Sequence, residues 1–65
     1  MKSYEVIVED IYDKNKSKKV KLDAVNVYLA HKDGLKHANA LREEISKIIC
    51  KGKIVFTYSS GFSED

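Results

Sequence analysis

The feature that most constrains the fold is a change in the spacing of apolar residues within residues 4–29. This stretch contains two strand-like runs joined by a lysine-rich segment. In each run the apolar residues occupy even positions over one part and odd positions over another. Because side chains alternate between the two faces of a strand, each change of parity moves the apolar surface to the opposite face. The sequence therefore predicts a β-hairpin that is apolar on opposite faces at its root and at its tip.

A loop over residues 13–18 places Tyr12 opposite Lys19, and the parity changes of the two strands then coincide, which supports this register. In this register the apolar residues of the root share one face of the hairpin, and those of the tip share the other. The root set is Tyr4, Val6, Val8, Val25 and Val27, and the tip set is Ile7, Ile11, Val20, Leu22 and Ala24. We therefore expect the two sets to be covered by different partners.

A helix is predicted after the hairpin, between Asp33 and Gly52. A carboxylate at the first position accepts hydrogen bonds from the free amides of the first turn, and glycine readily adopts the conformation that ends a helix. Between them, apolar residues recur at steps of three and four, which is typical of one face of an α-helix. These residues are Leu35, Ala38, Leu41, Ile45, Ile48 and Ile49.

The predicted order of elements is β-β-α-β, with the last strand over residues 53–58. In this strand Ile54, Phe56 and Tyr58 are expected to face the core. A helix that joins the second and third strands makes them parallel, and the first strand fits between them. We therefore expect a small two-layer α+β fold, with a three-stranded sheet in the order 2-1-3 and one amphipathic helix on one face.

The chain of 65 residues is long enough for one domain. We expect this α+β domain over residues 1–58, with a basic hairpin loop at residues 13–19, and a short frayed tail over residues 59–65 in which Phe62 is the candidate anchor. A domain of this size buries only about 60% of its unfolded surface. Cys50 is the only cysteine, so no internal disulfide can form. Self-association is therefore the expected source of additional stability.

Four apolar residues at the tip and back of the hairpin form the predicted interface. One helix covers only one face of the sheet, so these side chains stay uncovered in the predicted fold. Apolar patches of this kind mark sites of contact with other proteins, and open strand edges offer a second route through strand addition. We therefore expect a small non-enzymatic interaction or regulatory protein that forms a homodimer or binds a larger protein target. The predicted interface residues are Ile7, Ile11, Val20 and Leu22.

The alternative hypothesis is nucleic-acid binding through the basic loop. An extended arm of lysines can neutralise phosphates with little dependence on base sequence. Against this, Glu9, Asp10 and Asp13 lie across the hairpin and reduce the positive charge, and the loop contains no arginine that could make bidentate contacts. The candidate phosphate-binding residues are Lys14, Lys16, Lys18, Lys19 and Lys21.

Catalysis is not expected from this sequence. His31 and His37 are six residues apart, which is not the spacing of two ligands on one helical face. No nucleophile elbow or glycine-rich phosphate loop is present. We therefore expect no cofactor, metal or small-molecule substrate. The absence of a long apolar run, and the acidic residues near the N-terminus, favour a cytoplasmic location without membrane contact.

Overall fold

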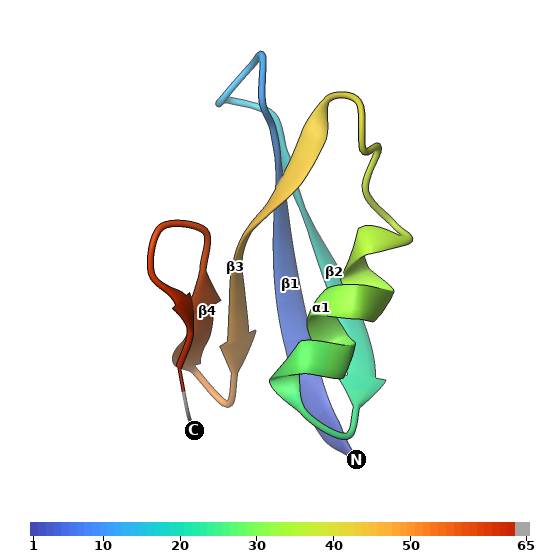
Figure 1. Cartoon of the computed structure of the whole chain (residues 1–65), viewed down its shortest axis with the longest axis vertical. Coiled ribbons are helices and arrows are strands. Elements are labelled where there is room, and N and C mark those ends of the chain that lie inside the picture. Colours follow the sequence, from blue (N-terminus) through green and yellow to red (C-terminus); the bar gives the residue numbers. More distant parts are fainter. Residues whose placement is uncertain (64–65) are drawn as a thin grey trace.

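Five strands and one helix make up the part of the chain that the structure describes. The computed structural model describes residues 1–63. The elements are β1 (Lys2–Asp10), β2 (Ser17–Ala24), α1 (Val27–Leu35), β3 (Glu43–Cys50), β4 (Lys53–Thr57) and β5 (Gly61–Phe62). All neighbouring strands pair antiparallel, in the order β2-β1-β3-β4-β5, and α1 packs on one face of the sheet (Figure 1).

The prediction of a small α+β fold with one helix is confirmed, but the predicted three-stranded sheet is wrong. Two of the five strands, β3 and β5, lie in segments that were predicted as helix and as tail. The last predicted strand corresponds to β4, which runs antiparallel to its neighbour β3. A hairpin connection between β3 and β4 replaces the predicted helical crossover, so no parallel pair is formed.

The first hairpin has a different register from the predicted one. Tyr4 lies opposite Leu22, and Val6 lies opposite Val20. Val27, which was predicted to face Tyr4, lies five residues beyond this partner and outside the strand. Because five is an odd number, the shift places the even positions of both strands on one face. The apolar side chains at the even positions of both strands therefore share the face that α1 covers, and Ile7 lies on the opposite face.

The helix begins at an asparagine that lies within the predicted second strand. The side chain of Asn26 accepts a hydrogen bond from the backbone N–H of Leu29 at 3.0 Å, which caps the first turn. Val27, Ala30 and Gly34 then face the sheet at steps of three and four residues. The predicted N-cap at Asp33 is wrong, since this residue lies inside α1. The small side chains at positions 30 and 34 allow the helix to approach the sheet closely.

A β-bulge in β3 explains why this strand has the apolar spacing of a helix. Neighbouring residues of β1 pair with Ile45 and Lys47, which leaves Ser46 between them as an extra residue. An extra residue interrupts the alternation of side chains along the strand. Ile45 and Ile48 consequently both face the core, although they are three residues apart. The three-residue spacing of Ile45 and Ile48, which predicted a helix, is therefore produced by a bulged strand.

A second bulge lies in β4, where Ile48 pairs with Phe56 while Ile49 pairs with Ile54. The extra residue, Val55, is fully buried, and Phe56 beside it is also buried. Ile54 and Tyr58, which were predicted to face the core, are exposed.

The core consists of apolar side chains from α1 and the first four strands. Its buried members are Tyr4, Val6, Val8, Ala24, Val27, Ala30, Ile45, Ile48, Cys50, Val55 and Phe56. In the segment expected as a frayed tail, Gly61 and Phe62 form β5 and pair with β4. Residues 64 and 65 of that predicted tail lie outside the described part of the chain.

Candidate interaction surface

The structure does not bring the four predicted interface residues together. Val20 and Leu22 lie on the face that α1 covers, where they are partly buried against the core. Ile7 lies on the opposite face of the sheet, across from Lys19. Ile11 follows β1, and its side chain is 44% exposed. These residues therefore do not form one continuous apolar patch, because the observed register separates Ile7 from Val20 and Leu22.

The uncovered face of the sheet carries both apolar and charged side chains. Ile7 and Ile49 alternate there with charged residues, and Lys19 Nζ lies 3.2 Å from Glu5 Oε2. One face of an antiparallel sheet is commonly exposed to water, and this mixture is typical of such a face. The sheet surface alone therefore gives no strong indication of a partner.

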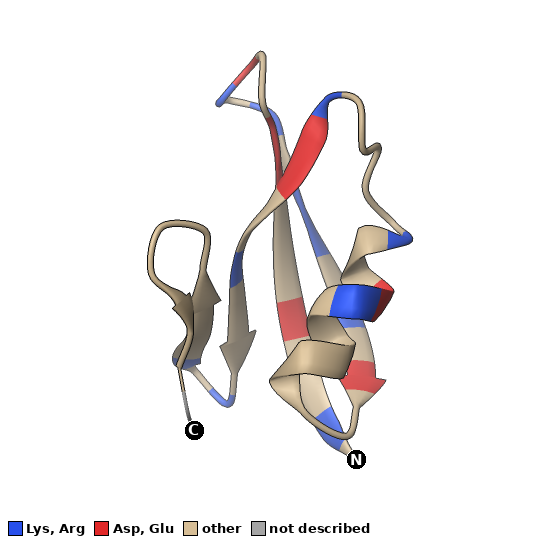
Figure 2. Cartoon of the chain, in the orientation of Figure 1, with Lys and Arg blue, Asp and Glu red and all other residues tan. Residues whose placement is uncertain are grey.

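The five candidate phosphate-binding lysines lie in the β1–β2 loop and along β2, on one edge of the sheet. Two of them are engaged within the chain. Lys18 Nζ donates a hydrogen bond to the carbonyl of His37 at 2.7 Å and lies 3.6 Å from Glu43, and Lys19 pairs with Glu5 as described above. Figure 2 shows the acidic positions at the start of β3 close to the basic positions of β2.

The other three lysines, Lys14, Lys16 and Lys21, are exposed and form no ion pair with any described residue. Of the five candidate lysines, these three are therefore the ones whose charge is available to a phosphate.

The loop between β1 and β2 is held in place by Asp10. Its carboxylate accepts hydrogen bonds from the backbone N–H groups of Tyr12 and Asp13, at 2.8 and 3.2 Å. Arg42, at the start of β3, donates to the other carboxylate oxygen from Nε and Nη2, at 3.0 and 2.9 Å. The Tyr12 hydrogen bond, together with those from Arg42 and Asp13, lowers the pKa of Asp10 although burial opposes this shift. Asp10 therefore has a structural role.

A cluster of four aromatic rings joins α1 to the C-terminal strands. The ring centroids of Tyr28 and Phe62 are 4.4 Å apart, and those of Phe56 and Phe62 are 4.8 Å apart. His31 packs edge-on against Phe56 and Phe62, at 4.8 and 5.4 Å. Phe56 is buried beneath the others, whereas Tyr28 is 60% and Phe62 40% exposed. The cluster therefore has a base in the core and an upper part in contact with solvent.

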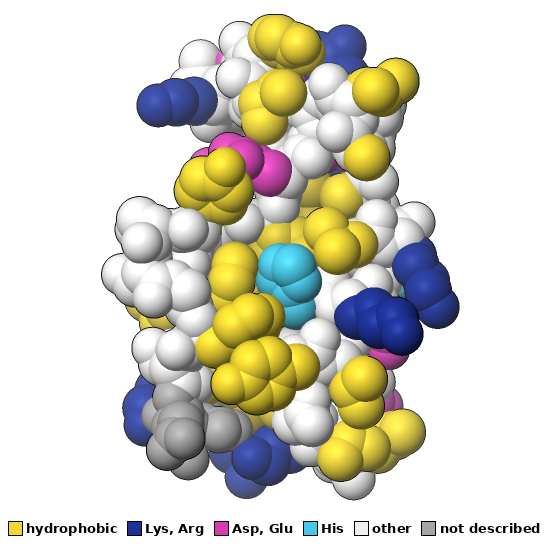
Figure 3. All heavy atoms as spheres, in the orientation of Figure 1, with side chains coloured by type: hydrophobic (Ala, Val, Ile, Leu, Met, Phe, Trp, Pro, Cys, Tyr) yellow, Lys and Arg dark blue, Asp and Glu magenta, His cyan; other side chains and the backbone are white. Residues whose placement is uncertain are grey.

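Leu35 extends this cluster along the helix. Tyr28, His31 and Leu35 are spaced i, i+3 and i+7, which places them on one flank of α1. Leu35 is half exposed. Figure 3 shows hydrophobic side chains gathered around a histidine on this face of the molecule. We call Tyr28, His31, Leu35 and Phe62 the aromatic surface.

Burial among these rings lowers the pKa of His31 through desolvation. The rings of Phe56 and Phe62 provide no hydrogen-bond acceptor for a charged imidazole. The neutral form of His31 therefore fits its surroundings better than the protonated form.

The sequence prediction missed the aromatic surface because it placed Tyr28 and His31 outside the helix. One signal for it was present. Asn26 followed by Val27, Ala30 and Gly34 is the pattern of a capped helix with a narrow buried face. The position of Phe62 could not be inferred in the same way, because it depends on the pairing of β5 with β4.

Within residues 1–63, no group of three or more histidine, cysteine, aspartate or glutamate side chains could hold a metal ion. The described chain also contains no helix that is long and apolar enough to cross a membrane. Comparisons with protein-family models, curated proteins and solved structures found no match to this chain.

Proposed function

We propose that this chain is a non-enzymatic interaction protein that acts through protein–protein contact and self-associates through the aromatic surface. The observation that supports this proposal is the exposure of Tyr28 and Phe62 although their rings already pack against each other. Aromatic side chains provide a large contact area, and tyrosine is enriched among the residues that dominate binding energy.

The aromatic surface is suited to binding because its rings are ordered before a partner arrives. Phe62 rests on the buried ring of Phe56, and His31 packs against both. Side chains that are already fixed lose less conformational entropy on association, which favours affinity. The mixed uncovered sheet face lacks such a cluster.

A second copy of the chain is the proposed partner. A two-fold interface uses the same patch on both subunits, so an apolar patch can cover itself. A standard interface takes roughly 800 Å² from each partner, and the chain exposes 4582 Å² in total. About a sixth of the surface would then be covered. Dimerisation would also extend the small core.

The test is the mass of the protein in solution, measured by sedimentation equilibrium over a concentration series. We expect a dimer at high micromolar concentration. Tyr28→Ser should weaken it at least tenfold, because central aromatic residues contribute about 2 kcal/mol or more. Tyr58→Ser is the matched control, since Tyr58 is 68% exposed and makes no ring contact with a described residue. A wild-type chain that stays monomeric at every concentration contradicts the proposal.

Nucleic-acid binding remains the second candidate, now supported by Lys14, Lys16 and Lys21 on the exposed edge. Replacing these three by glutamine should remove binding to single-stranded or duplex DNA and RNA. Replacing Lys18 and Lys19, which are engaged within the chain, should have a smaller effect. Affinity should also fall steeply between low and physiological salt, because counterions are released on binding. Absence of binding at low salt would exclude this candidate.

A further inference from the structure

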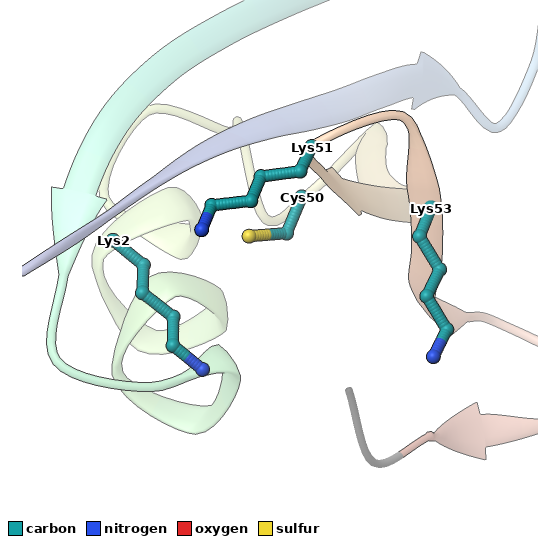
Figure 4. A pocket seen from close by; sticks show the side chains of 4 residues that line it. All are labelled: Lys2, Cys50, Lys51 and Lys53. Atoms are coloured by element: carbon teal, nitrogen blue, oxygen red, sulfur yellow. The ribbon is translucent and has the colours of Figure 1, made fainter.

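A pocket with basic walls lies at the end of the sheet where β3 turns into β4. Its volume is about 280 Å³, and its described lining residues are Lys2, Cys50, Lys51 and Lys53. Figure 4 shows the three lysine side chains arranged around the pocket, with the sulfur of Cys50 directed toward the side of Lys2 and Lys51. None of these lining residues is acidic. The described part of the lining therefore combines lysine side chains with the small apolar surface of a buried thiol.

The backbone of Lys51 gives an independent indication that this lysine has a role. Lys51 and Gly52 form the two-residue turn between β3 and β4, with φ angles of 53° and 78°. Turns with positive φ at both central positions favour asparagine or aspartate followed by glycine. A lysine side chain is disfavoured in this left-handed conformation. Residues in sparsely populated backbone conformations cluster at functional sites.

The charges of Lys51 and Lys53 are not neutralised within the described chain. Neither residue takes part in an ion pair with a described residue, whereas Lys18, Lys19 and Lys36 each do. Cys50 also lines the pocket and is 5% exposed, and Figure 4 shows its sulfur directed away from Lys53. Two cationic groups beside an apolar wall would attract an anion that carries more than one negative charge.

We propose that this pocket binds the phosphate group of a compact phosphomonoester, with Lys51 and Lys53 as its charged contacts. Lysine is a common phosphate ligand and acts as a point charge. The pocket volume lies just below the roughly 300–1,000 Å³ range of small-molecule sites, so the ligand must be small. Cys50 and the methylene stems of the lysines provide contacts for its organic part. This site is separate from the aromatic surface and does not depend on the proposed self-association.

The test uses titrations of the full chain with glycerol 3-phosphate, inorganic phosphate and glycerol, followed by ¹H–¹⁵N NMR. We expect saturable shifts at residues 50–53 with the first two ligands and none with glycerol. Lys51→Asn and Lys53→Gln should each weaken binding about fivefold, the upper limit for an exposed ion pair. Lys14→Gln, which removes an equal charge far from the pocket along the sequence, should leave binding unchanged.

Lys51→Asn also separates binding from folding. Asparagine tolerates the left-handed conformation better than lysine, so this variant should have a higher melting temperature while it binds the phosphomonoester less tightly. A stable variant that binds weakly cannot be explained by unfolding.

The rate of Cys50 alkylation gives a second readout, because Cys50 is the only thiol of the chain. Glycerol 3-phosphate should slow its reaction with iodoacetamide. A comparison of the two phosphate ligands distinguishes the sources of the anion: tighter binding of glycerol 3-phosphate indicates a phosphomonoester site, whereas equal binding indicates a site for the phosphate group alone. Shifts that do not saturate, or binding that Lys51→Asn and Lys53→Gln leave unchanged, would overturn the proposal.

Discussion

Replacing Gly34 by alanine tests how closely α1 approaches the sheet. In an open helix interior this change stabilises a protein by up to about 1 kcal/mol, because glycine is the less favourable helix residue. Gly34, however, is buried against the sheet. A Cβ atom at this position would lie 3.0 Å from Cγ1 of Val6 and 3.2 Å from Cδ1 of Ile45.

The two contacts differ in how easily they can be relieved. The Cδ1 atom of Ile45 is the end of a flexible side chain and can move. Val6 is fully buried in the middle of β1, and its β-branched side chain has few alternative rotamers. Overpacking in a core costs about 1–3 kcal/mol, which exceeds the gain in helix propensity. We therefore expect Gly34→Ala to destabilise the protein by about 1 kcal/mol, or roughly 4–8 °C in melting temperature.

Thermal and urea unfolding followed by circular dichroism measures this change. Lys32→Gly is the control, because Lys32 lies on the exposed side of the same helix and should cost about 1 kcal/mol through propensity alone. An increase in stability for Gly34→Ala would refute the close approach of α1 to Val6. An absence of any effect for Lys32→Gly would refute the helix boundaries themselves.

Two further predictions concern ionisable groups. Asp10→Asn should lower the melting temperature, because Arg42 loses its charged partner. Because the pKa of Asp10 is lowered, its contribution to folding stability is fully present above its ordinary pKa of 3.8 and is lost as the pH falls through the lowered pKa. The free energy of unfolding measured below pH 4 should therefore depend less on pH in Asp10→Asn. The pKa of His31 is also lowered, so its contribution to folding stability is fully present above pH 6.5. This contribution is lost as the pH falls through the lowered pKa. Self-association measured by sedimentation should weaken as the pH falls through the lowered pKa of His31, and His31→Gln, but not His37→Gln, should reduce this pH dependence.

The strands with simple alternation were predictable from the sequence. In β1 the even positions Tyr4, Val6 and Val8 are apolar, and the structure buries all three. The last predicted strand also coincides closely with β4. In both segments the β-branched and aromatic residues indicate a strand, but the alternation predicts the buried face correctly only in β1, because the bulge at Val55 interrupts it in β4. Local pattern was sufficient to identify both strands because no other element competed for the same residues.

The helix and the register were not predictable by the same reasoning. Ile45 and Ile48 have helical spacing only because a bulge at Ser46 interrupts the alternation, and bulges leave no distinct pattern in one sequence. Val25 and Val27 continue the β-branched composition of β2, although on odd instead of even positions, but the cap formed by Asn26 ends the strand and begins α1. A β-branched pattern was therefore overridden by capping and by packing against the sheet.

The candidate surface changed as a consequence. The predicted interface depended on a register that placed the apolar residues of the root and of the tip on opposite faces of the hairpin. The observed register places the even positions of both strands on one face, so this interface is not formed. The aromatic surface depends on contacts between Tyr28 and Phe62, which are 34 residues apart in the sequence. Only the pairing of β5 with β4 brings these two rings together. Long-range contacts of this kind cannot be inferred from local spacing.

The central claim is that the chain associates with itself through the aromatic surface. The most direct measurement is a dilution series of ¹H–¹⁵N NMR spectra at neutral pH. We expect concentration-dependent shifts at the amides of Tyr28, His31 and Phe62, with the amides of β2 unchanged. Shifts centred on β2, or spectra that do not change with concentration, would contradict the account.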